Sequence, residues 1–154
     1  MPAEGNNASM TVENQIWAKR KKARQACVCY LYAIALDGEC GQELLCELYE
    51  EFTEESVDWA YCEAVFLQIA EHLPTIDEEI SRRLVDWTIE RIAKVDLCVL
   101  RLAMFEMEQM KDIPVDVTIN EAVDLAKLYG ASEGAFVNGV LSAYNKDKLR
   151  PQQP

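Results

Sequence analysis

The chain has 154 residues, half of them hydrophobic, and a formal net charge of −12 at pH 7, which suits one domain with a buried core and argues against general affinity for nucleic acid. No apolar run reaches the roughly 18 residues that a membrane-spanning helix needs. The first residues also lack the basic and apolar regions of a signal peptide, so we expect a cytoplasmic protein.

Residues that could carry catalysis or bind a metal are few. None of the six cysteines forms a C-x-x-C pair, and His72 is the one histidine, so the sequence has neither a zinc-ligand spacing nor a nucleophile–base pair. It also has no glycine-rich phosphate-binding loop. We predict a protein that is not an enzyme and that uses no metal and no cofactor, with its cysteines reduced.

The two ends of the chain are polar and aperiodic. They predict a disordered leader over residues 1–15 and a flexible tail over 147–154, which leaves a single domain at 16–146. Inside this domain apolar residues recur every three or four positions, as in amphipathic helices. The first four predicted helices are one over 16–36, one over 42–52, one that Thr53 caps and Pro74 ends, and one that starts at Ile76 and carries Trp87 on its apolar face.

The second half of the chain continues the helical pattern after a break near residues 90–94. A fifth helix carries its apolar stripe from Val95 to Phe105, and Asp112-Ile113-Pro114 predicts the turn that follows. Thr118 and Glu121 have the spacing of a capping box, in which each side chain bonds the other's backbone N–H at a helix start. We therefore predict that a sixth helix begins there.

The last predicted helix starts at Ser132, after Gly130 has ended the sixth. Within it, Gly139 has no side chain, which predicts a closely packed neighbouring helix. No segment alternates polar and apolar residues as a strand does. The fold class that follows is all-α, a single-domain bundle of about seven helices.

Charge is distributed unevenly along the chain. Residues 19–24 contain five basic side chains in six positions, whereas residues 37–79 contain fourteen acids and no lysine or arginine. A short basic segment on an acidic body can contact RNA phosphates at one place and repel RNA elsewhere. A solvated basic helix start is the alternative. The candidate RNA contacts in this basic segment are Lys19, Arg20, Lys21, Lys22 and Arg24.

Aromatic side chains near a basic segment can stack on unpaired bases. Tyr30 and Tyr32 lie two to three turns after the basic segment and point in different directions, so we expect one of them in the core. Phe136 is the other candidate, although its spacing to Val140 favours a place in the core.

Several segments, taken in order, resemble the NusB family of transcription antitermination factors. The resemblance covers residues 17–145 and is strongest from 87 to 141. The segments that carry it are KKAR at 21–24, LY at 31–32, VD at 95–96, VLRLA at 99–103, DIP at 112–114, INEAVDLAK at 119–127 and FVNGVL at 136–141.

The resemblance implies an all-α protein without enzymatic activity. It implies binding of single-stranded boxA RNA together with NusE, a ribosomal protein, and a place in the RNA polymerase elongation complex. It also implies residue roles. The positions that match RNA contacts of the family are Arg20, Lys21, Lys22, Arg24, Tyr32 and Phe136, and the positions that match partner contacts are Asp96 and Glu133.

Two departures from the family pattern keep an alternative open. Leu97 stands where the family usually has a basic residue, and the segment before Phe136 is one residue shorter, which makes the assignment of Glu133 depend on the alignment. The alternative is a NusB-like protein-interaction module or homodimer without specific RNA binding. The intact basic segment favours the first hypothesis, and the acidic body favours the second.

Overall fold

The computed structural model describes residues 11–36, 43, 46–48, 50–53, 55–130 and 134–149. Over this part of the chain the regular structure is helical, with no strand, so the predicted all-α class is confirmed. The elements are α2 (Val12–Leu36), α4 (Trp59–Ser81), the 3₁₀ turn η1 (Ile89–Arg91), α5 (Lys94–Gln109), α6 (Val115–Leu128), α7 (Ala135–Tyr144) and the π-helical turn η2 (Asn145–Leu149).

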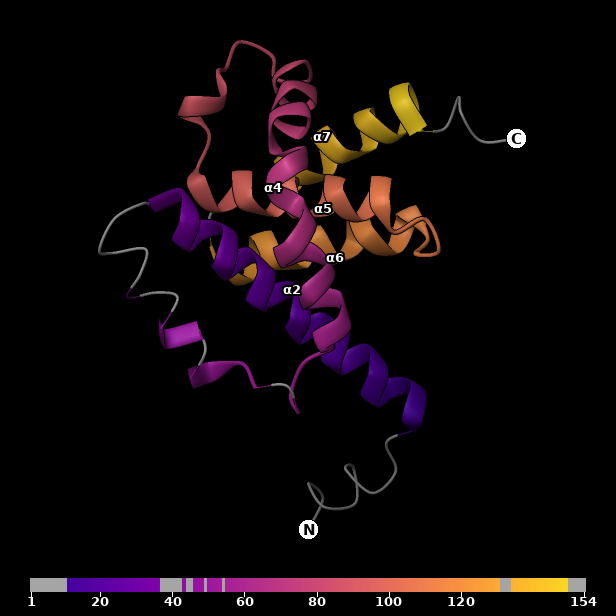
Figure 1. Ribbon diagram of the computed structural model, residues 1–154. Helices are drawn as coiled ribbons and strands as arrows, with labels where there is room; N and C mark the ends of the chain where they lie inside the picture. Colours follow the sequence, from indigo (N-terminus) through magenta and orange to yellow (C-terminus); the bar gives the residue numbers. More distant parts are fainter. Residues whose placement is uncertain are drawn as a thin grey trace.

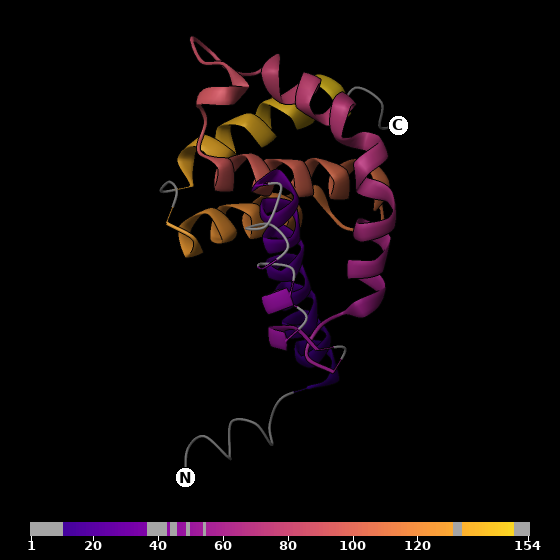
Figure 2. The same ribbon diagram turned by 60° about the vertical axis from the view of Figure 1, so that its left-hand side comes forward.

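Helix α5 is the centre of the bundle. It packs against α2, α4, α6 and α7. Figures 1 and 2 show α6 and α7 on either side of α5, with α2 and α4 running across it. Ten of its sixteen residues are buried, and each large apolar side chain among them stabilises the fold by roughly 1.5–3 kcal/mol.

Helix α4 runs straight through the position where a break was predicted. Pro74 lies inside it, so the predicted third and fourth helices are one element. A proline removes a backbone hydrogen bond, but side chains on both sides of it hold the helix in place. Ile69 and Ile80 are fully buried, and Asp77 accepts two hydrogen bonds from Arg101 of α5 at 2.8 and 2.7 Å.

The starts of two helices differ from the predicted ones. Asp58, and not Thr53, caps α4, because its carboxylate accepts the backbone N–H of Tyr61 at 3.2 Å. Helix α6 begins at Val115 behind Pro114, a residue suited to helix starts, so Thr118 and Glu121 already lie inside the helix and form no capping box. Their side chains instead make contacts with other helices.

The ends of the described chain also differ from the predicted domain limits. Helix α2 begins at Val12, inside the predicted leader 1–15, and η2 continues to Leu149, inside the predicted tail 147–154. Residues 1–10 and 150–154 lie outside the described residues, as does the predicted helix start at Ser132. Of the predicted helix over 42–52, the described residues 43, 46–48, 50 and 51 are helical, whereas Phe52 lies in a bend.

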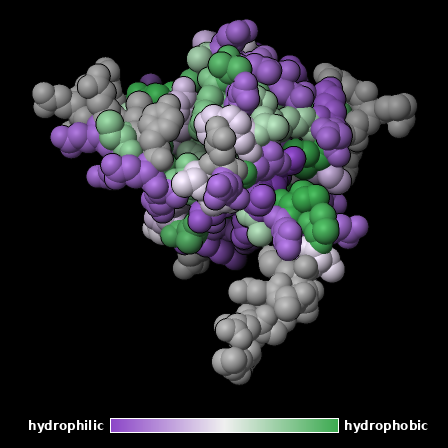
Figure 3. All heavy atoms as spheres, turned by 60° about the horizontal axis from the view of Figure 1, so that its bottom comes forward, coloured by the Kyte–Doolittle hydropathy of each residue, from purple (hydrophilic) through white to green (hydrophobic). Residues whose placement is uncertain are grey.

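Among the described helices, none combines the length and the hydrophobicity that a membrane-spanning segment needs. Hydrophilic side chains dominate the face drawn in Figure 3, and the hydrophobic residues on it form separate patches.

Candidate nucleic-acid interface

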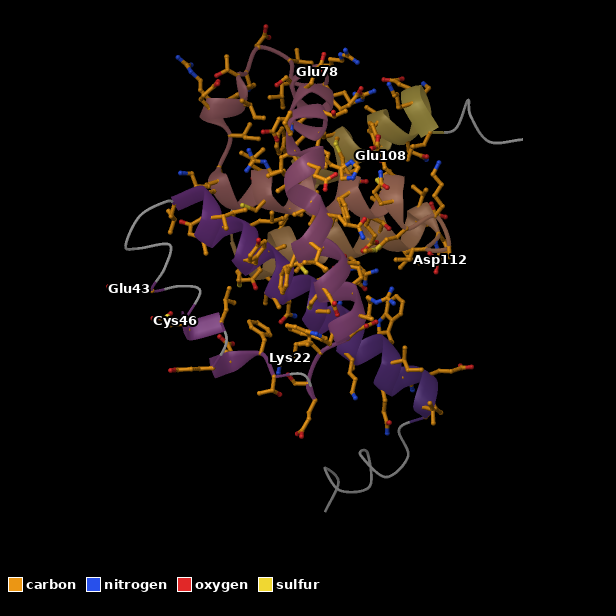
Figure 4. The ribbon with its side chains drawn as sticks, viewed as in Figure 1. Lys22, Glu43, Cys46, Glu78, Glu108 and Asp112 are labelled. Atoms are coloured by element: carbon orange, nitrogen blue, oxygen red, sulfur yellow. The ribbon has the colours of Figure 1, made fainter. Side chains whose placement is uncertain are left out.

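The basic segment of α2 divides into exposed and paired side chains. Lys19 and Lys22 are exposed and form no ion pair with any described residue. Arg20 donates from Nε to Asp58 Oδ2 at 2.8 Å and lies over the ring of Tyr61. Arg24 follows Lys22 by two positions, so the two side chains leave α2 on opposite sides. Figure 4 labels Lys22 on the lower half of that helix. Two of the five predicted phosphate contacts are therefore directly available.

Lys21 is held between α2 and α6. Its Nζ lies 3.1 Å from Glu121 Oε2 and 3.4 Å from Asp124 Oδ2. Partial burial disfavours the ammonium ion, but the hydrogen bond and charge of Glu121, together with Asp124, outweigh it and raise the pKa of Lys21. Its charge is thus secure at neutral pH but largely neutralised by the two acids, which weakens it as a phosphate contact.

The prediction that Arg24 contacts RNA is wrong, because its side chain is buried. Only 3% of its side chain is exposed, and its Nε and Nη2 donate to the two carboxylate oxygens of Glu106 at 2.8 and 3.2 Å. Tyr61 Oη donates to the same carboxylate at 2.6 Å, and the hydroxyl of Thr118 donates to it as well. Arg24 is therefore a structural residue that joins α2 to α5, and it cannot reach RNA from this position.

Burial and the ion pair with Glu106 shift the pKa of Arg24 in opposite directions. Burial alone disfavours the guanidinium charge, but the hydrogen bonds and charge of Glu106 raise the pKa of Arg24. For Tyr61, burial and the Glu106 charge both disfavour the phenolate and raise its pKa well above 10. The cluster therefore keeps a charged arginine and neutral hydroxyl donors around one buried carboxylate.

The Arg20–Asp58 pair makes the stability of the fold depend on pH. Partial burial of Asp58 would raise its pKa, but the hydrogen bonds from Arg20 and from the Tyr61 backbone hold that pKa below its usual value. A carboxyl whose pKa is lower in the folded state contributes stability above its unfolded pKa and loses it as pH falls through the folded one. The melting temperature should therefore fall between about pH 5 and pH 3.

We expect Asp58→Asn to reduce this fall in melting temperature, because the amide still caps α4 but no longer titrates. Thermal unfolding followed by circular dichroism at pH 5, 4 and 3 measures the effect. Asp112→Asn, at an exposed position in the turn after α5, is the matched control and should keep the wild-type slope. An Asp58→Asn slope equal to the wild-type slope would contradict the assignment.

A second part of the candidate interface is a hollow of about 590 Å³ beside the start of α7. Phe136 and Asp96, both singled out from the sequence, line it. Phe136 is half-buried, and Asp96 is buried in the first turn of α5. The other lining residues are Arg83, Leu84, Val85, Trp87, Arg91, Ile92, Ala93, Ala135, Gly139 and Val140.

Two lining residues differ from what the sequence predicted. Trp87 was placed on the apolar face of a helix, but α4 ends at Ser81, and Trp87 stands in the following loop with 58% of its surface exposed. Gly139 was expected beneath a closely packed helix, yet a Cβ added there would meet no atom within 4 Å. Gly139 instead leaves the wall of the hollow bare.

The remaining predicted residues lie apart from the basic segment. Tyr32 is half-buried near the end of α2, ten residues and about 15 Å along the helix from Lys22. Leu97, which replaces a basic residue, is half-buried and packs against the core. Glu133 lies outside the described residues.

Sequence reasoning missed Trp87, Arg83 and Arg91 as candidates. The one available signal was the break in helical periodicity near residues 90–94, which marks the loop that forms the rim of the hollow. Among the described residues, no three His, Cys, Asp or Glu side chains come together as metal ligands. The basic segment offers the two exposed lysines Lys19 and Lys22, and the hollow has two aromatic side chains in its lining, features that suit a helical binding protein.

Known proteins resemble this chain in sequence and in fold. A model of the NusB family matches residues 21–146. The chain is 38% identical over 130 residues to the transcription antitermination protein NusB of Bacillus subtilis (strain 168). The aligned region covers 84% of this chain and 96% of that protein. The chain belongs to the NusB family, and the resemblance seen in the sequence is confirmed.

Solved structures agree with this assignment. The fold matches a NusB of T. maritima with a TM-score of 0.66 and 36% identity, over 83% of this chain and 91% of that one. It also matches a chain in the crystal structure of the antitermination factors NusB and NusE in complex with dsRNA. There the TM-score is 0.68 and the identity 32%, over 82% of this chain and 95% of that one.

Proposed function

We propose that this protein is a transcription antitermination factor that binds boxA RNA together with NusE, joins the RNA polymerase elongation complex in the cytoplasm and supports transcription of ribosomal RNA. The observation that carries the proposal is its likeness to a chain solved with NusE and RNA, at 32% identity over 82% of this chain. The proposal gives the protein a binding role and no catalytic one.

The charge distribution supports a division of work between the protein and its partner. With a net charge of −12, the body repels RNA at long range, and the exposed cations Lys19 and Lys22 offer only a small attractive site. Binding by this chain alone should therefore be weak and sensitive to salt. A partner such as NusE would add contact surface for the same RNA and offset the repulsion.

Partner contact is proposed at the C-terminal half, where the family resemblance placed Asp96 and Glu133. Asp96 is buried in the lining of the hollow, so it would act there by shaping the surface beside Phe136. Glu133 precedes α7, close in sequence to Phe136. A partner held at this end would lie beside the RNA contact proposed for Phe136.

The deciding experiment is fluorescence anisotropy of a labelled boxA RNA and a scrambled RNA, titrated with the protein alone and with NusE, at two salt concentrations. We expect a preference for boxA, tighter binding with NusE and weaker binding at higher salt. Equal binding of both RNAs, with and without NusE, would overturn the proposal. It would favour the interaction module or homodimer, which the mass of the free protein in solution would then test.

Replacing both Lys19 and Lys22 by Ala should lower the salt dependence of RNA binding. For single-stranded RNA the slope of log K against log salt is about 0.7 per phosphate contact, so losing two contacts should reduce it by about 1.4. Lys111→Ala, at an exposed lysine in the turn after α5, is the control and should leave the slope unchanged. An unchanged slope in the double variant would place the phosphate contacts elsewhere.

A further inference from the structure

We propose that Cys27 and Cys62 form a redox-sensitive site, in which a small hydroperoxide such as hydrogen peroxide oxidises the two thiols to a disulfide that links α2 to α4. Cys27 lies near the middle of α2, and Cys62 lies at the start of α4. Both are free thiols in the structure, as predicted for a reduced protein. The disulfide is a second state of the same residues and does not depend on the proposed RNA function.

The two thiols meet in the core where α2 and α4 cross (Figure 1). Cys62 Sγ donates to the backbone carbonyl of Ala23 at 3.8 Å, and Ala23 lies about one turn before Cys27 on α2. The side chains of Cys27 and Cys62 also share a hydrogen bond. Neither residue is more than 1% exposed. Two sulfur atoms from different helices are therefore neighbours, which is the first requirement for a disulfide.

Backbone and side-chain contacts hold the two helices in this arrangement. Asp58, the N-cap of α4, donates its backbone N–H to the carbonyl of Lys19 in α2 at 3.1 Å. The carboxylate of Asp58 also pairs with Arg20 of α2. Cys62 follows Asp58 by one turn, and its own backbone N–H donates to the Asp58 carbonyl at 3.2 Å. The junction therefore presents the Cys62 thiol to α2 in a fixed position.

The environments of the two thiols assign them different roles. The hydrogen bond from Cys27 outweighs the effect of burial and lowers the pKa of Cys62. Burial raises the pKa of Cys27, and the hydrogen bond with Cys62 acts in the same direction. The thiolate is the form of cysteine that attacks an oxidant. Cys62 is therefore the nucleophile, and Cys27 is the thiol that reacts with the oxidised Cys62.

A cavity beside Cys62 selects the class of oxidant. Its volume is about 180 Å³, several times the roughly 30 Å³ that one water molecule occupies in the liquid, so hydrogen peroxide fits inside it. A protein or peptide that carries a disulfide is too large to reach a residue that is 1% exposed. The residues that line the cavity together with Cys62 are Ala26, Tyr30, Leu48, Phe52, Trp59 and Phe66.

One hydrogen peroxide oxidises the pair and leaves as two water molecules. The Cys62 thiolate attacks one peroxide oxygen, the O–O bond breaks, and Cys62 becomes a sulfenic acid. The other oxygen takes up the proton that Cys62 released and leaves as water. The sulfur of Cys27 then attacks the Cys62 sulfur, the S–O bond breaks, and the hydroxyl leaves with the Cys27 proton as the second water while the S–S bond forms.

The other described cysteines are placed less well for this reaction. Burial raises the pKa of Cys98 to about 11, which keeps it a thiol at neutral pH. Cys29 leaves α2 on the side opposite Cys27, and its sulfur lies 3.3 Å from the hydroxyl of Tyr129. Cys46, labelled in Figure 4, is exposed and lies away from the crossing of the two helices. We therefore expect one dominant cross-link in the folded protein.

Peptide mapping by mass spectrometry tests the proposal on the full-length protein after treatment with dilute hydrogen peroxide. Trypsin does not separate the two thiols, because residues 25–81 contain no lysine or arginine. A protease that cleaves after acidic residues places Cys62 on peptide 59–63 and Cys27 on peptide 14–37. We expect these peptides to be joined, with the loss of two hydrogens, and fragmentation to assign the link to Cys27 and not to Cys29.

The melting temperature gives a second readout of the same link. A disulfide between α2 and α4 restricts the unfolded chain, so the oxidised protein should melt at a higher temperature than the reduced one. Dithiothreitol should reverse the shift. Cys46→Ser is the matched control, because it removes an exposed thiol and should keep both the cross-link and the shift. Cys62→Ser should lose both.

Dimedone, a reagent that traps sulfenic acids, tests the assigned roles. In Cys27→Ala the sulfenic acid of Cys62 has no thiol to react with, so dimedone should label peptide 59–63. In Cys62→Ala, Cys27 should remain unlabelled, because its burial disfavours the thiolate. Circular dichroism of both variants shows that they are folded before they are treated. Labelling of Cys27 instead of Cys62 would overturn the assignment of the nucleophile.

The wild-type protein alone can overturn the site, whatever the variants do. Peroxide treatment in concentrated urea provides the comparison, since an unfolded chain should give a mixture of cross-links among its six cysteines. The same mixture from the folded protein would mean that the crossing of α2 and α4 does not direct the reaction. Oxidation of other cysteines while peptides 14–37 and 59–63 stay separate would show that Cys27 and Cys62 are only core residues.

Discussion

Arg24→Met is expected to lower the free energy of unfolding by about 3–5 kcal/mol. The replacement keeps much of the side-chain volume but leaves the carboxylate of Glu106 buried without its cationic partner, and Glu106 is only 1% exposed. The remaining donors, Tyr61 and Thr118, are neutral hydroxyls and cannot replace the charge. Urea unfolding followed by circular dichroism measures the change directly.

Two further variants separate this effect from a general loss of basic charge. Lys22→Met, on the same helix but exposed, should change the free energy of unfolding by no more than about 0.5 kcal/mol. Arg24→Met combined with Glu106→Gln should lose less than the sum of the single variants, because the buried charge has been removed along with its partner. Equal stability of Arg24→Met and Lys22→Met would show that the buried pair does not stabilise the fold.

Gly134→Ala is expected to cost about 2–5 kcal/mol, for two reasons that add. The backbone of Gly134 has a φ of +90°, which alanine adopts only with strain. In addition, a Cβ there would lie 2.7 Å from Cγ1 of Val123 in α6, so the junction between α6 and α7 must shift. Since α7 carries Phe136, RNA binding should weaken as well.

Gly130 provides the control that isolates the second reason. Its φ is +70°, but a Cβ there would meet nothing within 4 Å. Gly130→Ala should therefore cost only about 1–2 kcal/mol, from backbone strain alone. Thermal unfolding of both variants decides the point, and equal losses would mean that the contact with Val123 has no effect.

The sequence predicted the structure best where a simple apolar periodicity marked a single helix. The apolar stripe from Val95 to Phe105 predicted α5, and the Asp112-Ile113-Pro114 turn lies where it was expected. Arg24 shows the limit. A basic run predicts a solvated surface, and the carboxylate that makes Arg24 a buried residue comes from Glu106, 82 positions later in the chain.

Pro74, Trp87 and Gly139 were misjudged for a related reason. Each has a strong local preference: proline to end a helix, tryptophan to be buried, and glycine to allow close packing. In the structure, tertiary contacts hold α4 together through Pro74, while Trp87 and Gly139 face a hollow. Local rules could not reveal the hollow, because it exists only when three distant segments meet.

The central position of α5 has a consequence for how the molecule responds to damage. Because four helices rest on this one, none of them can separate without exposing α5, so the bundle should unfold in a single cooperative step rather than helix by helix. The surface with the exposed lysines of α2 and the hollow beside α7 are then lost together when the bundle unfolds. A destabilising substitution anywhere on the bundle lowers the fraction of molecules that present either surface, even when both surfaces are chemically intact.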